Sequence, residues 1–314
     1  MELKKVPKLN ISDYDSPNLS TRKKFIDKLY SSFREFGFVV IKNHSIALED
    51  LSKSQQSAKE LFNLPLENKI KYFVPNSGGQ RGYTPFGKEH AKGSNFMDLK
   101  EFWHVGRDTS KKSNYNDKYP ENVWPQELPL FRPTSTALFS SLESLGDKIL
   151  EALTSKLGVP TNYFKEMTEH SNSVLRLLHY PPIPSGTDSR CIRAAAHEDI
   201  NLLTLLVSAS SGGLELKNQD GTWSPVDANP EEIIVNVGDM LSRITNDTLP
   251  SKTHRVVNPS ASNTSRYSSP FFIHPRNDFV LKCLDSCKGT GEKYAPITSD
   301  DFLMQRLKEI GLKK

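Results

Sequence analysis

The residues best suited to chemistry lie in one short segment, RAAAHEDINLLTLLV, which covers residues 193–207. His197 and Asp199 stand two positions apart in it, so an extended backbone points both side chains to one face. An imidazole beside a carboxylate supplies two thirds of a metal site. His254, at the head of a later apolar segment, is of the right type to complete the site from a different strand.

Two histidines and one carboxylate on a shared face leave octahedral positions open, and that arrangement suits non-haem Fe(II) chemistry. A lone His-x-Asp pair is a weak signal, because it occurs by chance in many chains of this length. The chain has eight histidines. We expect those outside the predicted metal site to be ordinary surface or core residues, and they are His44, His90, His104, His170, His179 and His274.

A second pair of residues, in the segment SRYSSPFFIHP, has the same spacing as His197 and Asp199. Arg266 and Ser268 lie two positions apart and share a face on a strand. A guanidinium forms a two-pronged contact with a carboxylate, and a neighbouring hydroxyl adds another donor. The pair therefore predicts a carboxylate clamp. The alternative is an arginine on a solvated strand edge with a serine beside it.

The elements in the first half of the chain are predicted to be mainly helical. Apolar residues recur at helical spacing over 18–36, 47–63 and 134–157. Between the last two helices, residues 75–120 are rich in Gly, Ser, Asn and Pro and keep no period. Such a stretch favours a functional loop region over a regular element.

Strands dominate the second half of the chain. A short buried strand is expected at 38–41, and further strands follow residue 170, separated by turn residues. Short strands with turn signals between them indicate a sandwich or barrel rather than a parallel sheet. The later strands are predicted over 173–180, 200–207, 213–217, 232–237, 253–257, 267–273 and 279–284.

Composition narrows the class of protein. The 314 residues are 36% hydrophobic and 25% charged, which is typical of a globular chain. The densest apolar run, 202–207, is far shorter than the roughly 20 residues of a membrane span. The 41 basic and 37 acidic residues are spread along the chain without a basic stripe. We therefore expect neither a nucleic acid nor a membrane as partner.

The cysteine content indicates a reducing compartment. Three cysteines cannot build a disulfide framework, and no apolar stretch of a secretory signal follows the charged N-terminal residues. Cys283 and Cys287 lack the second pair that a zinc site would need. We expect a cytoplasmic protein.

The order of motifs resembles the isopenicillin N synthase-like branch of the Fe(II)/2-oxoglutarate-dependent oxygenases. The motifs are YPP, HED, THRVVNP and RYS, and the likeness extends over nearly the whole chain. VPKLNISDYD, FREFGFVVIKNHSI, RGYTPFGKE and YAPITSDDFLMQRLKEIGL are also similar to members of that branch. LRLLHYPP, RAAAHEDINLLTLL and GDMLSRITNDTLPSKTHRVVNP look most like bacterial members.

The resemblance implies a mainly β fold with flanking helices, built on a distorted double-stranded β-helix of the jelly-roll or cupin-like kind. Residues 1–120 would form an N-terminal region of helices and strands that covers the active site. Residues 121–314 would form the jelly-roll catalytic core, with a long support helix and a C-terminal tail. We expect the two parts to form one compact unit.

The resemblance also implies a reaction. His197, Asp199 and His254 would ligate Fe(II). Fe(II), 2-oxoglutarate and O2 would together oxidise a small organic molecule by hydroxylation, desaturation or ring closure, and succinate and CO2 would be released. The distal carboxylate of 2-oxoglutarate would be held by Arg266, Ser268 and the hydroxyl of Tyr180.

Two positions depart from patterns that are frequent in the family. Leu178 stands where many plant relatives have an asparagine, so any contact from that residue is lost. Glu198, between the two predicted ligands, stands where threonine or serine is frequent. On a strand it points to the opposite face, so we expect no contact with iron.

Two other functions stay open at this point. Isopenicillin N synthase itself uses its Arg-x-Ser pair to hold the carboxylate of its substrate and uses no 2-oxoacid, so Arg266 and Ser268 predict an anion without saying which. The first alternative is therefore an Fe(II) oxidase independent of 2-oxoglutarate. The second is a cupin-like metal-binding protein without catalysis. A zinc hydrolase is disfavoured because HExxH is absent.

Substrate contacts are predicted at five positions. Phe272 follows Ser268 by four residues and should share its inward face. The RGYTPFG segment often covers the iron in relatives, and Arg193 could meet an acidic group of the substrate. The predicted contacts are Phe272, Arg81, Tyr83, Phe86 and Arg193. The sequence leaves open the substrate itself, the outcome of its oxidation and the oligomeric state.

Overall fold

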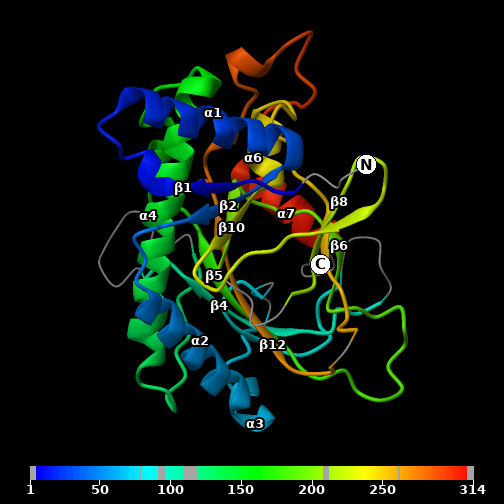
Figure 1. Ribbon diagram of the computed structural model, residues 1–314. Coiled ribbons are helices and arrows are strands. Elements are labelled where there is room, and N and C mark those ends of the chain that lie inside the picture. The colour runs from blue at the N-terminus through cyan, green and yellow to red at the C-terminus, as the bar shows by residue number, and fades with distance from the viewer. Residues whose placement is uncertain are drawn as a thin grey trace.

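The computed structural model describes residues 5–75, 77, 79–90, 96–108, 119–207, 212–260 and 262–309. Helices α2 and α4 run along one side of the strands, at the left of Figure 1. Two sheets, whose strands pair mostly antiparallel, account for most of the strands, and a two-stranded ribbon of β13 (Val280–Leu281) and β14 (Ile297–Thr298) lies outside them. This is the mainly β architecture with flanking helices that the sequence predicts.

The larger sheet has eight strands in the order β1-β2-β10-β7-β12-β5-β4-β3. Its neighbours pair antiparallel except for β1 with β2. Its strands are β1 (Lys8–Asn10), β2 (Phe38–Lys42), β3 (Gly82–Thr84), β4 (Glu101–Gly106), β5 (Val174–Tyr180), β7 (Leu203–Val207), β10 (Ile233–Val237) and β12 (Arg266–Ile273).

The smaller sheet has four strands in the order β6-β11-β8-β9, all antiparallel. It matters most for function, because its first two strands carry the predicted histidine ligands. Its strands are β6 (Ala194–His197), β8 (Leu214–Lys217), β9 (Trp223–Pro225) and β11 (His254–Val256).

The three predicted helices form near the expected positions, as α1, α2 and α4, whereas the shorter α3, α5, α6 and α7 were not predicted. Asn18 caps the first long helix, since its side chain accepts hydrogen bonds from the backbone of Ser20 and Thr21. Gly37 ends that helix with a φ of 65°, a conformation that favours glycine. The α-helices are α1 (Leu19–Phe36), α2 (Leu48–Asn63), α3 (Leu66–Ile70), α4 (Phe131–Leu157), α5 (Tyr163–Thr168), α6 (Asp239–Ile244) and α7 (Ser299–Glu309), and the short 3-10 helices are η1 (Ile11–Asp13) and η3 (Asp285–Cys287).

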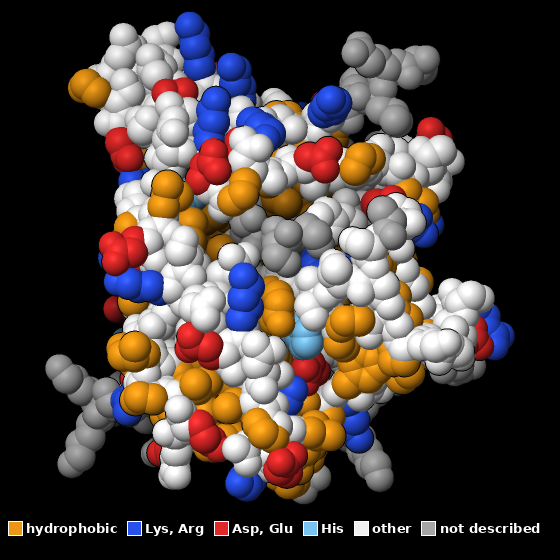
Figure 2. All heavy atoms as spheres, turned by 60° about the horizontal axis from the view of Figure 1, so that its bottom comes forward, with side chains coloured by type: hydrophobic (Ala, Val, Ile, Leu, Met, Phe, Trp, Pro, Cys, Tyr) orange, Lys and Arg blue, Asp and Glu red, His pale blue; other side chains and the backbone are white. Residues whose placement is uncertain are grey.

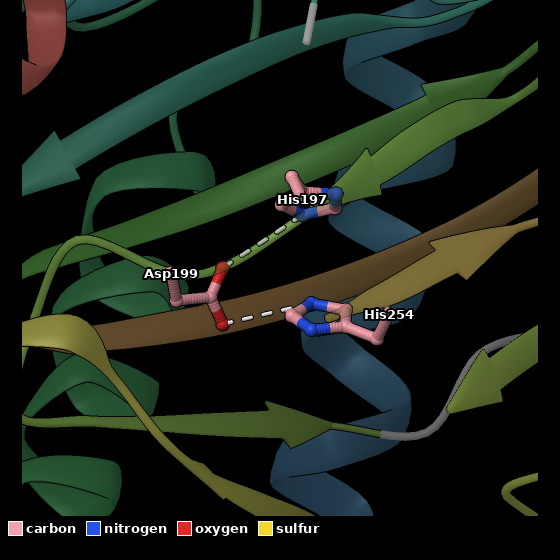
Figure 3. A group of neighbouring side chains, drawn as sticks. All are labelled: His197, Asp199 and His254. Carbon is pink, nitrogen blue, oxygen red and sulfur yellow. Dashed lines mark ion pairs between the residues drawn. The ribbon is translucent and has the colours of Figure 1, made fainter. Parts of the chain in front are cut away.

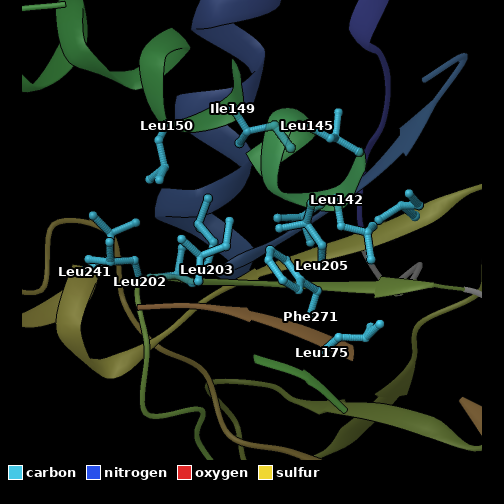
Figure 4. Close-up of a cluster of buried hydrophobic side chains, with 14 of the residues drawn as sticks. Leu142, Leu145, Ile149, Leu150, Leu175, Leu202, Leu203, Leu205, Leu241 and Phe271 are labelled. Carbon is cyan, nitrogen blue, oxygen red and sulfur yellow. The ribbon is translucent and has the colours of Figure 1, made fainter. Parts of the chain in front are cut away.

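The main core lies between α4 and the outer face of the larger sheet. Leu142, Leu145 and Ile149 of α4 face Leu205 of β7 and Phe271 of β12 (Figure 4). All five side chains are buried. This leaves the opposite face of the sheet free to line a cavity, so α4 supports the strands that carry the site without entering it.

Some strands of the structure were not predicted from the sequence. The interval 75–120, expected to be irregular, contains β3 and β4. All six residues of β4 are buried, so its sequence lacks the alternation that marks a half-exposed strand. The strands β6 and β9 were also missed because they are short, and only 280–281 of the predicted strand 279–284 forms.

Strands from both sides of residue 120 pair within the larger sheet. β2 pairs with β10, and β4 pairs with β5. The division of the chain at residue 120 stays a prediction. Among the residues that the structure describes, no helix is both long enough and apolar enough to cross a membrane.

The packing of α4 on α5 generates a prediction about pH. Burial, with the nearby Glu143 charge, raises the pKa of the Asp147 carboxyl to about 6. A raised pKa stabilises the fold at low pH. This contribution is fully present below the usual pKa of 3.8 and is lost progressively as pH rises from there through about 6. Asp147→Asn mimics the protonated form. We expect it to raise the free energy of unfolding at pH 7.5 by about 1–2 kcal/mol and to change it little at pH 3.5.

Urea unfolding at the two pH values checks this, with the exposed Asp285→Asn as control. An equal effect of Asp147→Asn at both pH values would contradict it.

Candidate active site

The structure brings the three predicted metal ligands together. His197 ends β6, Asp199 follows it by two residues, and His254 begins β11 directly opposite His197 in the strand ladder. The imidazole rings lie 4.5 Å apart between centroids. The Nε2 atom of each histidine lies 3.8 Å from an oxygen of the Asp199 carboxylate (Figure 3). One donor atom from each residue lies within 4.8 Å of the others, so one ion can reach all three.

Backbone carbonyls fix the orientation of both rings. Nδ1 of His197 lies 2.7 Å from the carbonyl oxygen of Ala195, and Nδ1 of His254 lies 3.1 Å from that of Lys252. A carbonyl can only accept, so each Nδ1 carries the proton and each Nε2 turns its lone pair toward the carboxylate. Both rings are thus set to coordinate through Nε2.

The larger sheet holds the carboxylate. Oδ2 of Asp199 accepts hydrogen bonds from the hydroxyl of Thr204 on β7 at 2.6 Å and from the amide of Asn236 on β10 at 2.8 Å. Burial works against the charged form, but the electrostatic influence of the nearby His254 and His197 and these hydrogen bonds hold the pKa of Asp199 below its usual value. Burial and His254 lower the pKa of His197. The carboxylate is therefore ionised and His197 neutral, as metal binding requires.

The donor set fits Fe(II). Two imidazole nitrogens and one carboxylate oxygen form the facial triad of non-haem iron sites and leave other positions for small ligands. Within the described part of the chain, this is the one group of at least three histidine, cysteine or acidic side chains with metal-binding geometry. Glu198 does not belong to it, because its carboxylate accepts a hydrogen bond from Thr253 at 2.6 Å.

A cavity of about 400 Å³ lies in front of the triad, between the two sheets. Figure 2 shows a hollow on this side of the molecule, with histidine atoms visible among hydrophobic side chains. Alternate residues of β5 and β12, and of their flanking segments, line it. The facing pairs are Tyr180 with Arg266, Leu178 with Ser268, and Val174 with Phe272. Arg176, Pro270, Asn172 and His274 continue the two alternating series and also line the cavity.

The predicted clamp occupies one end of this series. The Arg266 guanidinium carbon lies 5.0 Å from the centre of the Tyr180 ring, and its Nη1 donates to the hydroxyl of Ser268 at 3.2 Å. Nε donates to the carbonyl oxygen of Gly212. The Arg266 side chain is almost fully buried, and burial lowers its pKa. A fixed, buried guanidinium beside two hydroxyls suits a carboxylate.

The five predicted substrate contacts are placed differently from one another. Phe272 faces the cavity. The other four, Arg81, Tyr83, Phe86 and Arg193, are not among the described residues that line it. The hydroxyl of Tyr83 bonds to the buried Glu101, and Phe86 is half-buried elsewhere.

Two of these residues lie behind the cavity wall. Arg81 donates to the side-chain oxygen of Asn172 at 2.8 Å and to the carbonyl oxygen of Gln80, both cavity residues. Arg193 donates to the carbonyl oxygen of Thr264 at 2.5 Å, with its guanidinium carbon 6.0 Å from the centre of the Tyr180 ring. Both side chains contact residues that line the cavity, but neither side chain lines the cavity itself.

The sequence interpretation missed several cavity residues. His90, His104 and His274, expected to be ordinary surface or core residues, line the cavity. The alternation of side chains along a strand would have predicted two of the missed residues. His274 is six positions after Ser268 and Arg176 is four positions before Tyr180, so each shares the inward face of that residue. The remaining polar residues come from segments without a usable period, and they are Gln80, Glu89, Asp98 and Lys100.

Comparison with known proteins matches both parts of the chain. Residues 6–127 match the family described as "non-haem dioxygenase in morphine synthesis N-terminal". Residues 171–275 match the "2OG-Fe(II) oxygenase superfamily". The 2-oxoglutarate-Fe(II) type oxidoreductase hxnY of Emericella nidulans is 31% identical, over 96% of this chain and 89% of its own length.

Solved structures agree with this assignment. A 2OG-Fe(II) oxygenase family protein from Caulobacter crescentus is 42% identical with a TM-score of 0.86, over 96% of this chain and 98% of that one. A full-length Neurospora crassa protein, crystallised in complex with alpha-KG and thymine, is 26% identical with a TM-score of 0.86, over 96% of each chain. The predicted double-stranded β-helix core is confirmed.

The triad predicts that Asp199→Ala abolishes metal binding without unfolding the protein, because it removes the one carboxylate ligand and leaves two imidazoles. Anaerobic Fe(II) titration followed by calorimetry measures the affinity, and circular dichroism monitors the fold. Asp188→Ala is the control, since Asp188 is exposed and pairs with Arg190. Unchanged Fe(II) affinity in Asp199→Ala would refute the assignment of this ligand.

Proposed function

Because the chain belongs to the non-haem Fe(II)/2-oxoglutarate-dependent oxygenases, we propose that it oxidises a small organic molecule and releases succinate and CO2. Fe(II) and 2-oxoglutarate are its cofactors, as in this family. One observation carries the proposal. A metal triad and a buried carboxylate clamp line the same cavity of about 400 Å³.

Each residue of the triad has a proposed role. Nε2 of His197, Nε2 of His254 and the Asp199 carboxylate hold the metal. Bound Fe(II) and 2-oxoglutarate supply the oxidising chemistry, in which O2 is reduced while 2-oxoglutarate loses CO2. Thr204 and Asn236 keep the carboxylate in place, because both donate hydrogen bonds to its Oδ2.

The clamp orients 2-oxoglutarate. Arg266 and Ser268 donate to its distal carboxylate, and the Tyr180 hydroxyl adds a donor from the opposite strand. The clamp residues are buried, so these hydrogen bonds form away from bulk water, where charge-assisted contacts are strong. The opposite end of 2-oxoglutarate then extends toward the metal.

The substrate occupies the rest of the cavity. Phe272 offers an apolar surface for it, while Phe38, Leu206 and Val256 keep water from the reacting C–H bond. Cavity residues such as His104 come from the first 120 residues, which supports a covering role for that region.

A small molecule is the proposed partner, and the cytoplasm is the proposed location. The three free cysteines, Cys191, Cys283 and Cys287, suit a reducing compartment.

Uncoupled turnover tests the proposed function. Anaerobic protein receives Fe(II) and 2-oxoglutarate and then O2, and succinate is measured. We expect succinate from the wild type, none from His197→Ala, and wild-type amounts from His170→Ala, a control because the His170 side chain is 46% exposed. If the wild type forms no succinate and 2-oxoglutarate gives no visible charge-transfer band with the anaerobic Fe(II) protein, the proposal fails.

The clamp generates a separate prediction. Arg266→Ala removes charge-assisted hydrogen bonds of about 1.5–3 kcal/mol, so the apparent KM for 2-oxoglutarate should rise roughly 10- to 100-fold. Arg266→Lys keeps the charge but loses the two-pronged geometry, and it should recover part of the affinity. Calorimetric titration with 2-oxoglutarate checks the same change without turnover. An unchanged affinity in Arg266→Ala would instead assign the clamp to the carboxylate of the substrate.

A further inference from the structure

The end of the cavity away from the clamp carries polar side chains to which the proposed function gives no role. Arg176 stands on β5 two positions from Leu178, and Asn172 and His274 line the cavity just beyond the paired residues Val174 and Phe272. Gln80 and His104 complete this end. We call these five residues, Arg176, Asn172, His274, Gln80 and His104, the polar end.

Arg176 is fixed before any ligand binds. Its Nε donates to Nε2 of His104 at 2.6 Å, and its two Nη atoms donate to the carboxylate of Glu89 at 3.2 and 3.3 Å. The guanidinium carbon lies 4.2 Å from the centre of the Phe102 ring and 5.3 Å from that of Phe272. A guanidinium has five N–H bonds, so two remain beyond these three contacts with the described residues. Arg176 is therefore a preoriented donor in the cavity wall.

His104 is neutral and acts as an acceptor toward Arg176. Its Nδ1 lies 2.6 Å from the carbonyl oxygen of Gly79 and must carry the proton, which leaves Nε2 free of one. Burial, and then the charge of Arg176, lower its pKa well below the usual value. The ring thus adds no charge to the polar end.

The charges around Arg176 cancel. Lys100 pairs with Glu89 at 2.7 Å and with Asp98 at 2.8 Å, so two cations face two carboxylates. Burial opposes these charged forms, but the facing charges lower the pKa of Glu89 and raise that of Lys100. A ligand with a net charge beside Arg176 would add an uncompensated charge in a buried place, which is costly. The Arg81 guanidinium, which forms no ion pair with the described residues, stands behind the Asn172 amide to which it donates and does not line the cavity. The position beside Arg176 therefore favours a neutral group.

The remaining side chains define a pattern of donors and acceptors. The Asn172 oxygen accepts from Arg81, which fixes the amide so that its nitrogen donates to Gln80 at 3.1 Å and keeps one further N–H. Nδ1 of His274 is buried and has no hydrogen-bond partner among the described residues. Burial lowers the pKa of His274 to about 4, so it is a neutral ring with one donor and one acceptor.

We propose that the polar end recognises a neutral, single-ring cyclic amide or imide, whose carbonyl oxygens accept from Arg176 and Asn172 and whose ring N–H pairs with His274. This inference rests on the proposed function. A cavity of about 400 Å³ must also hold 2-oxoglutarate, which limits the substrate to about one ring.

The same binding mode places the ring beside the metal site. Phe272 pairs in the sheet with Thr204, whose hydroxyl bonds to the Asp199 carboxylate. A flat ring held at the polar end and packed on Phe272 thus lies next to the triad. Arg176, Asn172 and His274 are specificity residues in this scheme, and Phe272 is the surface that positions the C–H bond.

Binding without turnover tests the inference. The protein is loaded with Mn(II) and 2-oxoglutarate and titrated by calorimetry with thymine, 2-piperidone and cyclopentanecarboxylate, a ring of similar size with a net charge of minus one. We expect thymine or 2-piperidone to bind at least tenfold more tightly than cyclopentanecarboxylate. If neither amide binds, or if cyclopentanecarboxylate binds as tightly, the inference is overturned.

Variants locate the effect. Arg176→Lys keeps the charge opposite Glu89 but loses the remaining N–H pair, so it should weaken amide binding at least tenfold and leave 2-oxoglutarate affinity unchanged. Arg132→Lys is the matched control, an arginine paired with Asp108 and packed on Trp124 outside the cavity. Equal losses of amide and 2-oxoglutarate affinity in Arg176→Lys would assign Arg176 a structural role and overturn the inference.

A further variant tests the charge balance around Arg176. Glu89→Gln leaves the positive charges of Arg176 and Lys100 in excess, so the affinity for anionic cyclopentanecarboxylate should rise at least tenfold while thymine affinity changes less. No gain for cyclopentanecarboxylate would overturn the argument from neutrality. A wild type that binds 2-oxoglutarate and forms succinate but binds no amide would refute this inference alone, whereas absent succinate and 2-oxoglutarate binding would refute the proposed function itself.

Discussion

The Asp199 carboxylate is the point at which the two sheets of this protein meet. One of its oxygens faces His197, which ends β6 of the smaller sheet, and the other accepts hydrogen bonds from Thr204 and Asn236 of the larger sheet. Its backbone carbonyl also accepts from the nitrogen of Asp239, at the start of α6. The position of the metal site therefore depends on the packing of both sheets. The helix α4 contributes to the chemistry only by holding the outer face of the larger sheet in place.

The alternation of side chains along β5 and β12 orders the cavity. Because the two strands pair antiparallel with Arg266 opposite Tyr180, every second residue on each faces inward, and the inward series runs from a charged clamp to neutral polar side chains. A shift of one residue in this register would turn the clamp outward. The order of binding sites along the cavity thus follows from strand pairing.

The sequence could predict those functional residues that lie close together along the chain or on one strand. His197 with Asp199, and Arg266 with Ser268, are pairs of that kind, and the helices near 18–36, 47–63 and 134–157 follow from their apolar spacing. The polar end could not be predicted in this way. It needs β4 beside β5, which is a long-range pairing of a strand buried on both faces, and it needs Glu89 from a loop. Arg81 shows the reverse case, because its segment suggested a substrate contact while its side chain packs behind the wall.

A cavity that receives two small molecules must keep each in its own place, and we propose that the charge distribution does this here. 2-Oxoglutarate carries two carboxylates, which suit the Arg266 clamp at one end and the metal at the other. Around Arg176 the carboxylates of Glu89 and Asp98 already balance the cations, so a second dianion would meet no net positive charge there. In the proposed scheme, Glu89 thereby makes the polar end unsuitable for the co-substrate and leaves it to a neutral ring. Its carboxylate holds Arg176 in position, and we propose that it also excludes the wrong ligand.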